Sequence, residues 1–256
     1  MDFKDHFSAH AAAYAQARPG YPPELFAWLS AQCGGHALAW DAGCGNGQAS
    51  VALAEHFDSV YASDPSATQI ASAQPHDKVR YAVELAEQCA LADGSADLVT
   101  VAQAYHWFDA ARFCTEANRV LVPDGVIAVW TYAESRVDAA VDRVFDHFHN
   151  EQLADDWPAG REHVINAYRD LPFDFASIDV PAFEMRCHWT LAQYLAYLRS
   201  WSASQRYQQR TGGDAVDVIN DAMADAWGDP STARTVSWPL TILAGRRPPL
   251  PRGVVP

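Results

Sequence analysis

The stretch 36-HALAWDAGCGNGQAS-50 decides the fold of this chain. It opens with an apolar run at residues 37–40, which has the composition of a buried strand. Three glycines follow at every second position, and a helix-like segment covers residues 48–56. Glycine lets the backbone turn tightly and lets a ligand approach without a Cβ in the way. We therefore expect a strand, a glycine turn and a helix that together form a cradle for a small charged molecule.

Two classes of nucleotide ligand use such a turn, and the glycine spacing separates them. The dinucleotide fingerprint G-x-G-x-x-G, read from Gly43, would need a third glycine where Gln48 stands. The chain instead reads D-x-G-x-G-x-G, with Asp41 just before the turn. An acid at this place suits a ligand that carries a cation rather than a pyrophosphate. A tight strand–helix turn without a ligand is the less favoured alternative, because each glycine loses much conformational entropy on folding and packing alone does not require three of them.

Composition limits the kind of partner. The chain has 256 residues, 49% of them hydrophobic, which fits one large domain or one domain with an inserted cap. A net charge of −14 argues against a nucleic acid and an anionic membrane surface, because both need a basic face. We expect a small-molecule substrate and a monomer or homodimer. His6 and His10 lie one helical turn apart without a completing ligand set, so we expect no metal.

Cysteine usage and the absence of long apolar runs indicate the compartment. The five cysteines are odd in number, widely spaced and form no C-x-x-C motif, which is typical of reduced thiols. No apolar run approaches the length of a transmembrane helix, and the first residues, MDFKDHFSAH, do not read as a signal peptide. We therefore expect a cytoplasmic protein.

Strand-like and helix-like segments alternate after the glycine turn. Strand-like runs at 60–63, 79–86, 98–102 and 126–132 predict a parallel sheet with helices on both faces. Ligands bind such sheets at the carboxyl ends of the strands. Those ends carry the glycine turn, Asp64, residues 86–87 and residues 103–108, so they predict one binding edge.

Asp64 stands about 20 residues after the turn, where an acid accepts hydrogen bonds from ribose hydroxyls. Since Asp64-Pro65-Ser66 also starts a helix-like segment, an N-cap is the alternative role.

The pattern changes beyond residue 132. Helical stretches and turns fill 134–234 and predict a mostly helical cap for substrate recognition. Residues 235–246 read as a returning strand, and 248–256 form a Pro-rich tail. The core is therefore expected to comprise 1–133 and 235–247.

These segments together resemble the class I methyltransferases that use S-adenosylmethionine, of type 11 and near the trans-aconitate methyltransferase-like proteins. The matching residues are Phe7-Ser8, Tyr14, Arg18-Pro19-Gly20-Tyr21-Pro22, Asp41 to Gln48, Asp64-Pro65-Ser66, Ala86-Glu87, Gln103-Ala104, His106-Trp107-Phe108 and Leu198 to Ser202. The resemblance spans nearly the whole chain. Its glycine motif is specific for the cofactor but not for the substrate.

The resemblance implies an α/β, Rossmann-like, doubly wound sheet of seven strands with the last strand antiparallel. It also implies S-adenosylmethionine as cofactor, with the ribose at Asp64 and the adenine near residues 86–87. The chain departs from many relatives at Leu85, where they carry Asp. The expected cofactor-binding residues are Tyr14, Arg18, Asp41, Gly43, Cys44, Gly45, Gln48, Asp64, Pro65, Ala86, Glu87, Gln103 and Ala104.

The chemistry then expected is methyl transfer to a small organic molecule, either a carboxylic acid or a natural-product hydroxyl. A carboxylate or thiolate acceptor needs no general base, whereas for a hydroxyl or an amine His106 is the best-placed base. Packing of His106 against the cofactor without proton transfer is the alternative. The runner-up functions are a non-catalytic protein that binds S-adenosylmethionine and an NAD-dependent dehydrogenase.

Aromatic residues are the candidates for the substrate pocket, because a small carboxylic acid would need an apolar wall and an aromatic face also borders the sulfonium of the cofactor favourably. We expect Trp107, Phe108, Trp157 and Trp201 to line it. Two residues apart on a helix, Arg199 and Trp201 cannot face one ligand, so we expect Trp201 to form the wall and Arg199 to be structural. Burial in the core is the alternative for these aromatics.

Overall fold

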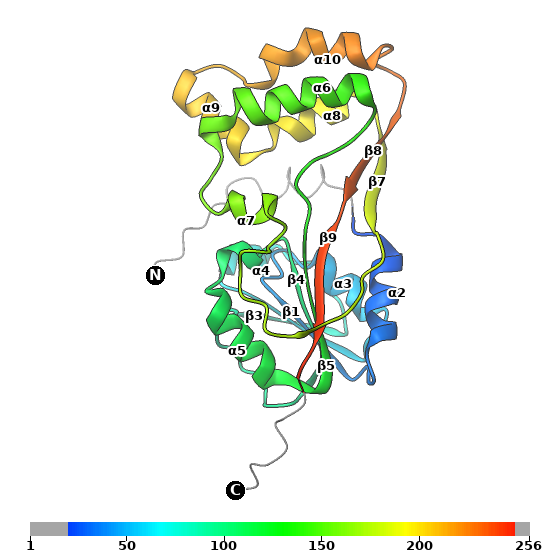
Figure 1. Cartoon of the computed structure of the whole chain (residues 1–256), viewed down its shortest axis with the longest axis vertical. Helices are drawn as coiled ribbons and strands as arrows, with labels where there is room; N and C mark the ends of the chain where they lie inside the picture. Colours follow the sequence, from blue (N-terminus) through cyan, green and yellow to red (C-terminus); the bar gives the residue numbers. More distant parts are fainter. Residues whose placement is uncertain (1–19, 249–256) are drawn as a thin grey trace, which may run out of the picture.

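The computed structural model of the chain describes residues 20–248. Figure 1 shows a sheet flanked by helices in its lower part and a group of helices above it. The expected contributions of Phe7, Tyr14 and Arg18, and most of the Pro-rich tail, lie outside the described residues.

Within that range the main sheet has seven strands in the order β3-β2-β1-β4-β5-β9-β6. Strands β1 to β5 pair in parallel, and β9 runs antiparallel to both β5 and β6. This confirms the predicted doubly wound sheet with its last strand antiparallel. The bounds are β1 Leu38–Ala42, β2 Ser59–Asp64, β3 Val79–Val83, β4 Ala96–Ala102, β5 Leu121–Thr131, β6 Ala176–Ser177 and β9 Thr241–Arg246.

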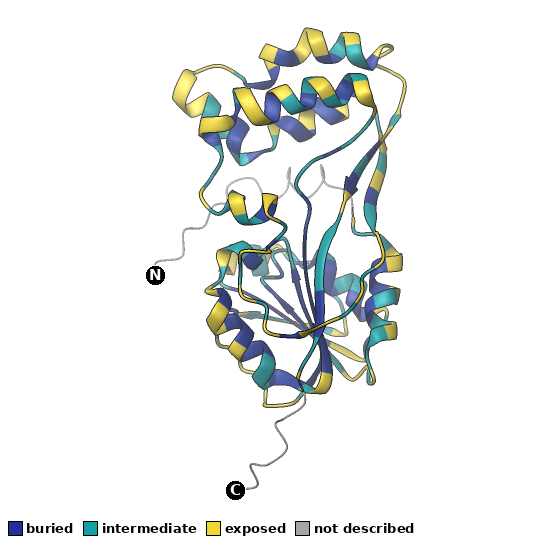
Figure 2. Cartoon of the chain, viewed as in Figure 1, coloured by how far each residue is buried: buried dark blue, intermediate teal, exposed yellow. Residues whose placement is uncertain are grey.

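Helices cover both faces of this sheet. Alternate side chains of β5 point to opposite faces, as strand geometry requires. Val126, Ala128 and Trp130 join a core with α2 (Pro23–Gln32) and α3 (Gln48–Ala54). Ile127 and Val129 join the other core, with α5 (Ala110–Val120). The central strands β1 and β4 and most of β5 are therefore buried on both sides, as Figure 2 shows in dark blue. The short α4 (Ala67–Ala71) and the 3-10 turn η2 (Tyr105–Trp107) follow β2 and β4.

The expected cap at 134–234 does not lie wholly apart from the sheet, because β6 within this range joins the main sheet. The helices of that range, called the cap below, have a hydrophobic core of their own. Its largest buried side chains, Tyr194, Trp227 and Trp238, pack together with residues of α6, α8 and α10. A short π-helix, η3, extends α6. The bounds are α6 Ala139–His147, η3 Phe148–Gln152, η4 Ala154–Asp156, α7 Arg161–Ile165, α8 Leu191–Arg199, α9 Ser202–Thr211, η5 Val216–Ile219 and α10 Asn220–Trp227. None of the helices in residues 20–248 has both the length and the apolarity needed to cross a bilayer.

The single strand expected at 235–246 is wrong, because the structure divides it at Leu240. Its first part, β8 (Arg234–Pro239), pairs antiparallel with β7 (Glu184–Trp189) in a separate two-stranded sheet. Its second part is β9 of the main sheet. The physical reason is that Val236 and Trp238 bury their side chains in the cap core, so β8 packs with the cap.

Candidate active site

The glycine turn follows β1 at the carboxyl edge of the sheet. Gly43, Gly45 and Gly47 all have left-handed backbone angles, with φ of 68°, 55° and 85°. A Cβ on Gly43 would lie 2.7 Å from Cβ of Ala104, and one on Gly47 would overlap the Tyr81 hydroxyl. At Gly45 the nearest atom is a side-chain oxygen 3.9 Å away. The turn is thus closed by protein on two sides and open at Gly45, where a ligand can approach the backbone.

Asp64 ends β2 beside that open position. Its Oδ2 accepts a hydrogen bond from the Gly45 N–H at 2.9 Å, and its Oδ1 accepts one from the Ser66 N–H at 2.8 Å. The N-cap role belongs to Ser66, whose Oγ accepts from the Gln69 N–H at the start of α4. Each carboxylate oxygen of Asp64 can accept a further hydrogen bond. Two backbone contacts therefore fix this acid next to the turn, which fits ribose recognition.

The position of Asp41 differs from the expectation that this acid faces a cationic ligand. Its side chain is fully buried, and its oxygens accept hydrogen bonds from Ser50 Oγ at 2.5 Å and Thr100 Oγ1 at 3.1 Å. Burial raises the pKa of this carboxyl to about 6. Asp41 therefore faces the interior behind the turn instead of a ligand's cation. Cys44 is also buried, and burial raises the pKa of its thiol, so it acts as a small turn residue.

Gln103 and Ala104 follow β4 on the same edge. Gln103 has a left-handed backbone, with φ of 57°. Its Nε2 donates to the Tyr132 carbonyl at 2.9 Å, and its Oε1 accepts from Thr131 Oγ1 at 2.7 Å. These bonds tie the end of β4 to the end of β5. Ala104 closes the turn at Gly43.

The remaining predicted cofactor residues lie around this edge. Gln48 begins α3, and Pro65 directly follows β2. Ala86 is buried after β3, and Glu87 Oε1 accepts from the Asp109 N–H at 2.7 Å. Because β3, β2, β1 and β4 are neighbours in the sheet, these residues share one edge with the glycine turn. An open glycine backbone and a fixed acid beside it suit S-adenosylmethionine.

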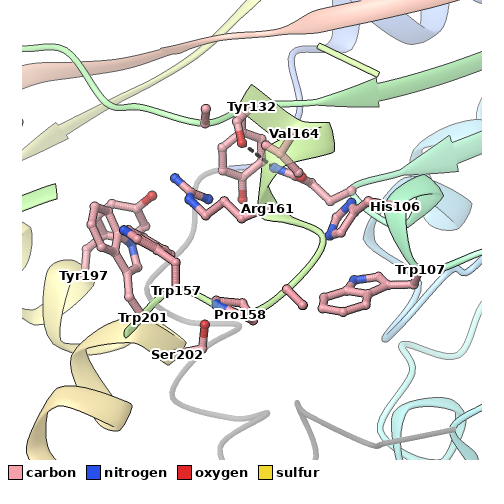
Figure 3. A pocket seen from close by; sticks show the side chains of 13 residues that line it. His106, Trp107, Tyr132, Trp157, Pro158, Arg161, Val164, Tyr197, Trp201 and Ser202 are labelled. Carbon is pink, nitrogen blue, oxygen red and sulfur yellow. Dashed lines mark hydrogen bonds between the residues drawn. The ribbon is translucent and has the colours of Figure 1, made fainter. Parts of the chain in front are cut away.

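A cavity of about 120 Å³ lies between this edge and the cap. Figure 3 shows His106 and Trp107 on one side and Trp157, Tyr197 and Trp201 on the other. The structure therefore brings five of the predicted site residues together: Gln103, His106, Trp107, Trp157 and Trp201. The full lining is Gln103, His106, Trp107, Tyr132, Ala133, Trp157, Pro158, Ala159, Arg161, Val164, Tyr197, Trp201 and Ser202.

Phe108 does not line this cavity, contrary to the expectation. Its ring packs on Phe113, with ring centres 5.1 Å apart, and fills the space beside Gly43. The neighbouring Trp107 keeps 40% of its surface exposed at the cavity. Consecutive residues of the 3-10 turn point in different directions, so only one of these two aromatic rings reaches the cavity.

Three aromatic rings form the cap side of the cavity. Trp201 is 5% exposed and packs on Trp157 and Tyr197, with ring centres 5.4 and 5.5 Å away. Trp157 Nε1 donates to the His149 carbonyl at 3.0 Å. Arg199, in contrast, forms ion pairs with Asp214 and Asp217. Trp201 therefore forms an apolar wall of the cavity, whereas Arg199 forms ion pairs within the cap.

Arg161 supplies a cation to the cavity wall. Its Cζ lies 3.7 Å from the centre of the Trp157 ring, and its Nη2 lies 2.5 Å from Nε2 of His149. A guanidinium can only donate, so Nε2 of His149 accepts and its proton sits on Nδ1, 2.8 Å from Asn150 Oδ1. Burial lowers the pKa of His149, which favours this neutral form. Two aromatic groups thus fix the orientation of the guanidinium.

His106 faces the cavity from η2. Its Nδ1 lies 2.9 Å from the hydroxyl of Tyr168, which is fully buried. Burial lowers the pKa of His106 to about 4, so its ring is neutral near pH 7. Ala167 and Tyr168 both have left-handed backbones, with φ of 59° and 58°. Such strain costs roughly 1–3 kcal/mol per residue, and it persists because Tyr168 packs between other rings.

The sequence reasoning missed part of this site. Tyr197 had a usable signal, since it stands four residues before Trp201 in a stretch that reads as one helix, where such residues share a face. The structure instead ends α8 at Arg199 and begins α9 at Ser202, with Trp201 extended between them. Tyr168 and His149 had none, because Tyr168 lies in the turn after α7 and His149 lies in the π-helix η3, where the ordinary helical spacing does not apply. Across residues 20–248 no cluster of three or more His, Cys, Asp or Glu side chains has the arrangement of a metal site.

The fold and site define a class of protein: a Rossmann-like methyltransferase that uses S-adenosylmethionine. Comparison with known proteins agrees. A family model described as "Methyltransferase domain" matches residues 40–129. A predicted methyltransferase of Dictyostelium discoideum is 30% identical over 255 residues, covering 96% of each chain. The chain therefore belongs to the class I S-adenosylmethionine-dependent methyltransferases.

Two further similarities support this assignment. The structure of a predicted type II methyltransferase from Anaeromyxobacter dehalogenans is 44% identical, with a TM-score of 0.87, and the match covers 91% of this chain and 99% of that one. A predicted S-adenosylmethionine-dependent methyltransferase of Saccharomyces cerevisiae is 29% identical over 140 residues, or 51% of this chain and 47% of the yeast protein. Methyl transfer from S-adenosylmethionine is thus the activity of the family.

Proposed function

We propose that the protein transfers a methyl group to a small organic acid bound in the cavity between core and cap. The observation that carries this proposal is the guanidinium of Arg161, held at the cavity wall by Trp157 and His149. Arginine matches a carboxylate with two parallel hydrogen bonds, and Trp157 and Trp201 offer an apolar surface for the remainder of the molecule.

The chain's own residues align the reactants. Bound S-adenosylmethionine supplies an electrophilic methyl group, and its transfer requires acceptor oxygen, methyl carbon and sulfur in line. The aromatic rings of the cavity exclude water and suit a sulfonium. The methylated atom is either the carboxylate oxygen or a hydroxyl elsewhere on the acid.

Thermal unfolding of the purified full chain, with and without ligand, tests the cofactor. S-adenosylhomocysteine should raise the melting temperature and NAD should not, because only a ligand that binds the native state stabilises it. A shift with NAD alone would refute the assignment.

A panel of small acids, phenols and thiols then tests the acceptor. Turnover should be confined to molecules with a carboxylate, and their methyl esters should be poor acceptors. Tight cofactor binding without turnover across the panel would favour a non-catalytic binding protein.

The cellular setting is part of the proposal. We propose a cytoplasmic monomer or homodimer without a nucleic-acid partner. All five cysteines are free thiols in the structure, which suits a reducing compartment.

A further inference from the structure

The cavity between the core and the cap is small and has aromatic rings on two sides. Its volume of about 120 Å³ is close to that of an apolar cavity of roughly 150 Å³ that binds benzene. His106 and Trp107 form the core side, with ring centres 4.7 Å apart, and Trp157, Tyr197 and Trp201 form the cap side (Figure 3). A space of this size admits one ring with a short substituent, and aromatic walls favour a flat ring over a puckered one.

The charges of the lining limit the number of anionic groups that the acceptor carries. Among the lining residues that the structure describes, Arg161 is the one with a permanent positive charge. Burial lowers the pKa of His106 to about 4, so this ring is neutral near pH 7. The negative charge of Glu162, which follows Arg161 on α7, also acts at His106. One carboxylate can pair with the guanidinium, whereas a second one would be desolvated near Glu162 without a cation.

The other polar groups of the lining do not replace a second cation. The Tyr197 hydroxyl accepts a hydrogen bond from Trp238 Nε1 at 3.0 Å. The Gln103 amide is bonded at both ends, because its Nε2 donates to the Tyr132 carbonyl and its Oε1 accepts from Thr131 Oγ1. Neutral groups of this kind can hydrogen-bond a carboxylate, but they do not balance its charge. The described lining therefore matches one anionic group on an otherwise apolar molecule.

We propose that the acceptor is a planar aryl monocarboxylate, about the size of one benzene ring with its carboxylate, and that the cavity rejects di- and tricarboxylates. This inference rests on the proposed function, since Arg161 is again the partner of the carboxylate, and it narrows the class of acid. The flat ring would lie between the aromatic side chains of the core and those of the cap. Such an acceptor differs from trans-aconitate, which carries three carboxylates.

Calorimetry on the full chain saturated with S-adenosylhomocysteine tests each part of this inference with a matched probe. Benzoate should bind, and benzamide, which has the same shape without the charge, should bind at least about tenfold more weakly. Cyclohexanecarboxylate keeps the charge on a puckered ring and should bind about threefold or more weakly than benzoate. Terephthalate adds a second carboxylate on the opposite side of the ring. Terephthalate and propane-1,2,3-tricarboxylate should both bind at least about tenfold more weakly than benzoate.

Trp107 supplies a readout from the protein side. Trp107→Leu keeps an apolar side chain but removes the flat face, and the exposed position of this residue makes the change compatible with folding. The preference for benzoate over cyclohexanecarboxylate should fall to near unity in this variant. Trp28→Leu is the matched control, because Trp28 is a partly buried tryptophan of α2 that packs on Phe183 outside the cavity lining. This control should keep the preference of the wild type.

The outcomes separate this inference from the proposed function. Benzamide that binds as tightly as benzoate would refute the carboxylate role of Arg161 and both proposals with it. Tighter binding of terephthalate or of the tricarboxylate than of benzoate would overturn the monocarboxylate and leave the acid acceptor standing. Equal binding of benzoate and cyclohexanecarboxylate to the wild type would overturn the planar ring. The absence of benzoate binding at millimolar concentration would overturn the aryl monocarboxylate, while turnover of other acids would still support the proposed function.

Discussion

Cζ of Arg161 lies 3.7 Å from the centre of the Trp157 ring. The two residues stand on either side of the 158–160 turn, at the start of α7 and just after η4. A guanidinium stacks on an indole more effectively than an ammonium does, because it is planar and more weakly hydrated. The contact therefore places a cation of fixed orientation at the cavity wall.

Replacement of Arg161 tests what this cation does. Arg161→Lys keeps the charge but loses the planar pair of N–H donors, and Arg161→Gln loses both the charge and this donor pair. We expect the KM for an acid acceptor to rise about tenfold in the first variant and more in the second, since a carboxylate contact is worth about 1.5–3 kcal/mol. The affinity for S-adenosylhomocysteine should not change. Arg186→Gln, at an exposed ion pair on β7, is the control. Equal KM values in all variants would contradict the role.

Trp201 tests the apolar wall. Trp201→Ala would cost about 3–5 kcal/mol of stability, because the side chain is almost fully buried in the cap core. Trp201→Phe is the cleaner change, and we expect it to lower kcat/KM severalfold while cofactor affinity stays constant. Trp227→Phe removes a similar ring from the same core away from the cavity. If both variants lose the same activity, cap stability and not the wall explains the effect.

Asp64 tests the cofactor edge. Asp64→Ala should weaken the binding of S-adenosylhomocysteine at least tenfold, because charge-assisted hydrogen bonds to the ribose would be lost. The melting temperature should also fall, since the Gly45 and Ser66 N–H groups lose their acceptor. Ser66→Ala removes the N-cap of α4 but keeps the Asp64 carboxylate, and it should lower stability by about 1 kcal/mol. Calorimetry showing full affinity in Asp64→Ala would leave this acid a purely structural role.

Asp41 makes stability depend on pH. Its pKa is raised to about 6 by burial, so the folded protein binds this proton more tightly than the unfolded chain. The resulting stability is present below the ordinary value of 3.8 and is lost as pH rises through about 6. Asp41→Asn stays uncharged at every pH. Its free energy of unfolding, relative to that of the wild type, should therefore rise by about 3 kcal/mol between pH 4 and pH 8. Urea unfolding at the two pH values measures this, and a constant difference would refute the shift.

The sequence by itself determined the sheet and its binding edge. The alternation of apolar strands and amphipathic helices fixes a parallel sheet, because each element must bury one face. The spacing of Gly43, Gly45 and Gly47 and the distance to Asp64 then place the predicted cofactor residues at the carboxyl ends of neighbouring strands. These signals are local or follow from topology, so no tertiary contact is needed to read them.

Only the tertiary structure decided the direction of individual side chains and the composition of the cavity. Asp41 turns into the interior because Ser50 and Thr100 offer hydrogen bonds there, and Phe108 turns toward Phe113. His106 meets a tyrosine 62 positions away along the chain. Such contacts join loops that carry no periodic pattern, so their partners are set by how the cap packs on the sheet.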